Sequence, residues 1–197
     1  MVAVAARRAS TVLFNGRDPL LPSLGVGPTF LLAFATLVLA CEHDTIAGFW
    51  PANSVVVALL LQTRMKEWWR ALGAGLIALV CARLLAGCPL VTVLVLSAIN
   101  GVEILACVGL VWLSARKGLD PAQPGHWVGF FIAAGILAPL TSAALAGWFL
   151  WTARGLSFFP TVSAWYLGDA IGLVAVTPVL VAISQVSLRL WRRYVLI

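Results

Sequence analysis

The sequence predicts an all-α polytopic membrane protein, a bundle of six transmembrane helices with both termini in the cytoplasm. Of its 197 residues 62% are hydrophobic and 10% charged, and the mean hydropathy is +1.02. Soluble domains are about 45–50% apolar and about 25% charged. The apolar runs are continuous, whereas the strands of a β-barrel would alternate apolar and polar residues. These observations exclude a soluble globular enzyme and a disordered chain.

Six apolar runs approach the roughly 17–25 residues that a spanning helix needs. They are Gly25–Cys41, Gly48–Gln62, Ala71–Cys88, Val91–Ser114, Trp127–Trp151 and Pro160–Gln185. The second is short and opens with Trp50-Pro51, so we expect it to be tilted, to extend towards Arg64, or to begin below the membrane surface. The connections are short and predict one membrane domain, residues 25–186. Residues 1–24 precede it as a cytoplasmic or interfacial segment, and residues 187–197 begin a cytoplasmic exit helix.

The basic residues set the predicted orientation, because Lys and Arg concentrate in cytoplasmic loops. With the N-terminus inside, the inner segments hold eleven of the 13 basic residues: Arg7, Arg8, Arg17, Arg64, Lys66, Arg70, Arg116, Lys117, Arg189, Arg192 and Arg193. Arg83 lies within the third run and Arg154 in an outer loop. The net charge of +6 therefore indicates the orientation in the lipid bilayer, and we expect no nucleic-acid partner.

Metal, disulfide and catalytic signals are weak. The tripeptide Glu42-His43-Asp44 has ligand-type side chains, but three consecutive residues rarely face one ion, so we predict a solvated loop and no metal site. Cys41 and Cys88 fall at outer helix ends, where an oxidising compartment would permit a disulfide; the alternative is that they are free, small hydrophobic residues. No enzyme or cofactor motif occurs, so we expect no catalysis in this chain.

Polar residues inside the predicted spans are the candidate site, because they are expensive in lipid. They are Arg83, Glu103 and Asp169, together with the amides Asn53 and Asn100. At ~1.5 Å per residue all five fall in the outer half or near the midplane, whereas the inner half holds chiefly Thr177-Pro178. This asymmetry predicts a polar pocket that opens outward. The alternative is an internal hydrogen-bonded cluster that only specifies packing.

Local spacing refines this prediction. Asn100 and Glu103 share one helix face, which Cys107 continues. Arg83 could extend its guanidinium towards this polar face, where it could pair with Glu103 or with Asp169, or it could extend outward to the interface. Pairing would leave one carboxyl group unmatched, which could bind a cation or an amine or hold a proton.

The tryptophans lie mostly near predicted helix ends, as in an aromatic belt. Trp50 is then either an interfacial residue at a helix entry or, with Asn53, part of the pocket wall. We expect Trp165 and Tyr166 at the interface. Gly168 and Gly172 have the small-xxx-small spacing of close helix packing.

Three motifs resemble a known family. Trp50-Pro51-Ala52-Asn53-Ser54 resembles the Trp-Pro opening of bacterial membrane-associated sensor domains of the MASE class, first type, although Ser54 stands where Gly or Ala is usual. Asn100-Gly101-Val102-Glu103 is similar to that family's Asn-x-x-Glu helix. The segment from Trp165 to Gly172, with Pro178 downstream, is similar to its Trp-x-x-Gly-Asp-x-x-Gly…Pro signature. The resemblance extends from about Phe30 to Val181.

The resemblance implies a multi-pass sensory module of the bacterial inner membrane. Such modules precede histidine kinases or diguanylate cyclases, so we expect a homodimer, and either an output domain in a longer protein or a separate cytoplasmic signalling partner. An unidentified small molecule would bind in the pocket, without a cofactor, at Trp50, Asn53, Arg83, Asn100, Glu103, Trp165 and Asp169. The alternative function, based on architecture alone, is the substrate-binding membrane component of a vitamin-type transporter.

Overall fold

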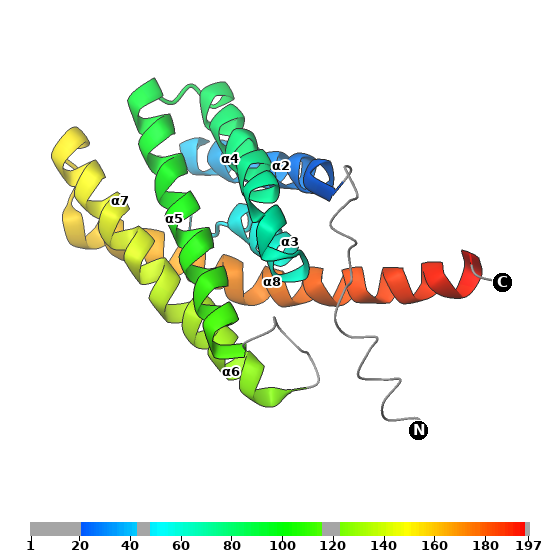
Figure 1. The fold of residues 1–197 in the computed structure, drawn as a ribbon. Helices are drawn as coiled ribbons and strands as arrows, with labels where there is room; N and C mark the ends of the chain where they lie inside the picture. Colours follow the sequence, from blue (N-terminus) through cyan, green and yellow to red (C-terminus); the bar gives the residue numbers. More distant parts are fainter. Residues whose placement is uncertain (1–20, 43–47, 116–122, 196–197) are drawn as a thin grey trace.

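The computed structural model describes residues 21–42, 48–115 and 123–195, and side chains within 26–38, 48–115 and 123–183. These residues form helices and short connections, with no strand among them. In chain order the elements are α2 (Leu21–Glu42), α3 (Ala52–Gln62), the 3₁₀ turn η1 (Met65–Glu67), α4 (Trp68–Leu85), α5 (Leu90–Ala115), α6 (Pro124–Ile132), the π-helical segment η2 (Ala133–Leu137), α7 (Ala138–Arg154) and α8 (Phe158–Val195). Figure 1 shows α8 passing the other helices and continuing beyond them towards the C-terminus.

Four helical segments are long and apolar enough to cross a membrane. They are Met65–Leu85, Leu90–Ala115, Pro124–Arg154 and Phe158–Ile183, and they correspond to the third to sixth predicted spans. The chain is therefore a multi-pass helical membrane protein. α2 occupies the place of the first predicted span with 22 residues. Which side of the membrane holds each terminus stays a prediction.

The second predicted span corresponds to α3, which is a half-length helix. It begins at Ala52 rather than Gly48 and has 11 residues, about 16 Å against a hydrocarbon core of ~30 Å. Nevertheless eight of its residues are buried, so α3 lies inside the bundle rather than at its surface. The count of six spans stays a prediction, because α3 covers about half of the bilayer by itself.

The fifth predicted span is continuous through a π-helical segment. Pro139 has no N–H to donate to the carbonyl of Gly135 four residues earlier. The hydroxyl of Tyr166 donates to that carbonyl instead, at 2.8 Å. The hydroxyl of Tyr166 thus satisfies the carbonyl that Pro139 leaves free, while its position at the membrane interface stays a prediction. The helix ends at Gly155, whose φ of +69° is the left-handed conformation that glycine adopts readily.

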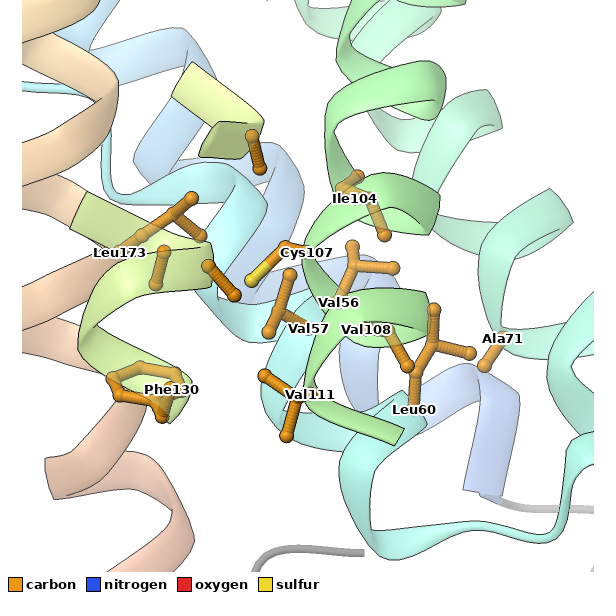
Figure 2. Close-up of a cluster of buried hydrophobic side chains, with 13 residues drawn as sticks. Val56, Val57, Leu60, Ala71, Ile104, Cys107, Val108, Val111, Phe130 and Leu173 are labelled. Carbon is orange, nitrogen blue, oxygen red and sulfur yellow. The ribbon is translucent and has the colours of Figure 1, made fainter. Parts of the chain in front are cut away.

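An apolar cluster lies among α3, α5, η2 and the neighbouring helices (Figure 2). Its members are Val56, Val57, Leu60, Ala71, Ile104, Cys107, Val108, Val111, Phe130, Ala133, Ala134, Ala138 and Leu173. Phe130 is the largest of its fully buried side chains. This apolar cluster adjoins the candidate site, because Cys107 and Leu173 each lie one helical turn after an acidic residue, Glu103 and Asp169.

Candidate functional site

Six of the seven predicted site residues are buried in the bundle. Asn53, Asn100 and Glu103 are 0% exposed, Arg83 and Asp169 are 2% exposed, and Trp50 is 6% exposed. We call these six residues the polar cluster. They come from α4, α5, α8 and the start of α3, so the folded chain brings together residues that are up to 119 positions apart.

Asn53 joins α3 to α5. It is the second residue of α3, and its side-chain Nδ2 donates to Oε2 of Glu103 at 2.8 Å. Its own Oδ1 accepts a hydrogen bond from the indole Nε1 of Trp50 at 3.2 Å. The carboxyl group of Glu103 thus contacts the first turn of α3, where the helix dipole favours negative charge.

Arg83 is held by uncharged partners. Its Nη1 donates to Oγ of Ser97 at 3.2 Å, and its guanidinium carbon lies 5.0 Å from the ring centre of Trp50. With the amide oxygen of Asn100 facing these donors, it accepts from Nη2 of Arg83 at 3.0 Å and from Nε1 of Trp50 at 3.2 Å. The guanidinium therefore binds a hydroxyl, an amide and an aromatic face.

Arg83 extends towards the polar face of α5, as one of its alternatives predicted, whereas the expectations of an ion pair or of an outward-extended side chain are wrong. Among the described side chains, the ion pair present joins Arg70 to Glu67 at 3.1 Å. Arg83 is instead 2% exposed, and Ser97 and Asn100, three residues apart on α5, present their polar groups to it. Both acidic residues of the polar cluster consequently keep carboxyl groups that no described cation contacts within ion-pair distance.

Asp169 and Glu103 form an acidic pair deep in the bundle. Their side chains are neighbours within hydrogen-bonding range. Ser142 of α7 donates to Oδ2 of Asp169 at 3.3 Å and lies 3.0 Å from the carbonyl of Pro139. Oε1 of Glu103 receives no donor from the described residues. The pair therefore has spare capacity to accept a hydrogen bond or bind a positive charge.

The two tryptophans of the predicted site differ in their burial. Trp50 was given two alternatives, and the interfacial one is wrong because the side chain is 6% exposed and lies among Asn53, Arg83 and Asn100. Trp165 is half-buried and its indole N–H lies near the carboxyl group of Asp169, but it makes no well-formed hydrogen bond with any described residue. That N–H is a second incompletely satisfied polar group beside the acidic pair.

Sequence reasoning missed three serines that complete the site. Ser97 supports Arg83, Ser142 supports Asp169, and Ser54 donates to the carbonyl of Gly172 at 2.8 Å. The spacing of Ser97, three residues before Asn100, could have placed it on the polar face of α5. Nothing in the sequence around Ser142 singles it out, because its role depends on α7 packing against α8.

The remaining predictions concern cysteines and metal ligands. Cys88 is a free thiol, so it does not form the disulfide considered with Cys41, whose own side chain lies outside the described residues. The tripeptide Glu42-His43-Asp44 also lies outside the described side chains. Elsewhere in the described chain, no group of three or more His, Cys, Asp or Glu side chains could hold a metal ion.

Comparison with known proteins gives one match. The model of the MASE1 family matches residues 20–194. No curated protein and no solved structure matches the chain significantly. The family match covers every element of the polar cluster, from the start of α3 to α8.

Proposed function

The chain belongs to the MASE1 family of membrane-associated sensor domains, and we propose that it senses a small ligand through the polar cluster on behalf of a cytoplasmic kinase or diguanylate cyclase. The family makes it a membrane sensory domain rather than an enzyme. The finer assignment, a ligand that enters from the outer side of the bacterial inner membrane, is supported by the polar cluster. As a signalling module of this type it would work as a homodimer.

The observation that carries the proposal is unmet hydrogen-bonding capacity next to buried acidic groups. Oε1 of Glu103 and the indole N–H of Trp165 both lie near Asp169, and neither makes a well-formed hydrogen bond with a described residue. Buried polar groups without partners are few in folded proteins, and each calls for an explanation. A ligand with a donor such as an amine would satisfy Glu103, and an acceptor on the same ligand would satisfy Trp165.

Sensing requires that the ligand prefer one arrangement of the polar cluster over another. A tenfold shift between two states needs ~1.4 kcal/mol of differential binding, which is about the net contribution of one good hydrogen bond. The polar cluster contains several hydrogen bonds that join different helices, so a ligand that replaces one of them would supply a sufficient difference.

The test measures output from a reporter kinase joined in frame after Ile197. Glu103→Gln and Asp169→Asn remove charge from the acidic pair while keeping its shape, and we expect each to change basal output at equal membrane levels. Glu67→Gln is the matched control, because it makes the same chemical change in η1, outside the polar cluster. Basal output unchanged in both variants of the acidic pair would refute the proposal.

A further inference from the structure

The chain turns sharply into α3 directly against α8. The backbone N–H of Trp50 donates to the carbonyl of Gly168 at 3.0 Å, and Oγ of Ser54 donates to the carbonyl of Gly172 at 2.8 Å. We call residues 50–54 the Trp50 corner. It is fixed to one face of α8 by two hydrogen bonds that are one helical turn apart.

Gly172 allows this contact because it has no side chain. A Cβ at this position would lie 2.3 Å from the carbonyl oxygen of Trp50 and 2.7 Å from its carbonyl carbon. These are backbone atoms, so no side-chain rotation could relieve the overlap. The Trp50 corner and α8 therefore touch backbone to backbone, and such a contact cannot absorb a displacement by rearranging side chains.

The side chain of Trp50 faces the polar cluster at the same time. Its ring lies under Arg83 at 5.0 Å, and its indole N–H is shared between Asn53 and Asn100 at 3.2 Å each. Asn53 in turn binds Glu103. One residue thus contacts the polar cluster through its side chain and α8 through its backbone.

We propose that the Trp50 corner transmits the state of the polar cluster to α8. This proposal rests on the proposed sensing function and adds its route of regulation. When a ligand or a mutation changes the hydrogen bond between Asn53 and Glu103, the first turn of α3 moves. The rigid contact of Trp50 with Gly172 then moves α8, the helix that continues to Val195. In this role the backbone of the corner is a positioning element, which acts on α8 through its contacts with Gly168 and Gly172.

Hydrogen–deuterium exchange on the full chain in lipid nanodiscs tests the coupling without an output domain. The probe is the amide of Trp50, which is readily isolated because Pro51 has none. We expect Glu103→Gln to accelerate its exchange by at least about twofold, the smaller end of coupling between residues in one network. The amide of Gly155, which is bonded to Trp151 at the far end of α7, is the control, and its exchange rate should not change. Faster exchange at both amides would indicate general destabilisation of the bundle. Unchanged exchange at Trp50 would overturn the proposal.

A double-mutant cycle in the reporter fusion tests transmission. We expect Gly172→Ala to abolish most of the effect of Glu103→Gln on output, with Ser54→Ala as the second variant if the first does not fold. Gly135→Ala is the matched control: it also contacts α8, at Val174, but only a side chain 3.3 Å away. Additive effects of Glu103→Gln and Ser54→Ala would overturn the proposal. If Glu103→Gln and Asp169→Asn both leave output unchanged, the sensing function fails, and the exchange measurement alone decides the coupling.

Discussion

The polar cluster and the apolar cluster are built on consecutive turns of the same helices, yet they hold the bundle in different ways. On α3, Asn53 belongs to the first and Val57 to the second; on α5, Glu103 is followed one turn later by Cys107. Hydrogen bonds in the polar cluster are directional and change with small movements. Apolar packing is non-directional and depends on filled volume. We therefore expect substitutions in the polar cluster to change signalling output and substitutions in the apolar cluster chiefly to lower stability.

The largest expected effect on stability lies in the apolar cluster. Phe130→Ala should lower the free energy of unfolding by about 3–5 kcal/mol, because it removes the largest fully buried side chain and leaves a cavity in its place. Phe131→Ala, at a neighbouring residue that is 45% exposed, is the control and should cost much less. Thermal unfolding in detergent measures both. Equal losses of unfolding free energy in the two variants would contradict the assignment of Phe130, rather than Phe131, to the buried core.

In the polar cluster, Asn53→Ala should cost less stability but change output. It leaves the buried Oε2 of Glu103 without its donor, an expected loss of about 1–3 kcal/mol. Gln62→Ala alters an amide at the other end of α3 and serves as the control. Reporter output and unfolding temperature are measured on the same variants. If Asn53→Ala lowers the unfolding temperature but leaves output normal, the polar cluster differs from the apolar cluster in composition only.

Tyr166→Phe tests the connection between the π-helical segment and α8. Without the hydroxyl, the carbonyl of Gly135 loses its donor, and we expect a loss of about 1 kcal/mol. Equilibrium unfolding measures the loss. An unchanged unfolding free energy would mean that another group satisfies this carbonyl.

The smallest effect is expected at the helix end outside both clusters. Arg70→Gln removes the ion pair with Glu67, but the Arg70 side chain is 47% exposed, so the expected loss is below about 0.5 kcal/mol. Repeating the measurement at high salt should shrink the difference between wild type and variant further. A larger loss that persists in salt would show that this pair is more strongly coupled to the fold than its exposure indicates.

The sequence predicted the helical class, four of the long spans and the residues that gather in the polar cluster. These predictions succeed because a charged side chain facing lipid is so unfavourable that Arg83, Glu103 and Asp169 gather inside the bundle, where polar partners are available. The residue at which α3 begins was not predictable, because the N–H of Trp50 before it is satisfied by the carbonyl of Gly168, far away in sequence. Ser97 was missed as a partner of Arg83 for a similar reason, because a serine in an apolar helix carries little signal until packing places it beside a charge.

Because α8 is one continuous helix from Phe158 to Val195, a tilt at one point along it displaces its far end. The Trp50 corner meets this helix at Gly172, and 23 further residues, ~35 Å of helix, lead to Val195. A tilt of about 5° at the corner would therefore displace the far end by roughly 3 Å. Pro178, one to two turns beyond the corner, removes one backbone hydrogen bond and provides a place where the helix can bend. A tilt that leaves the bundle packed would thus be large enough to shift the C-terminal end of α8 by a few ångström.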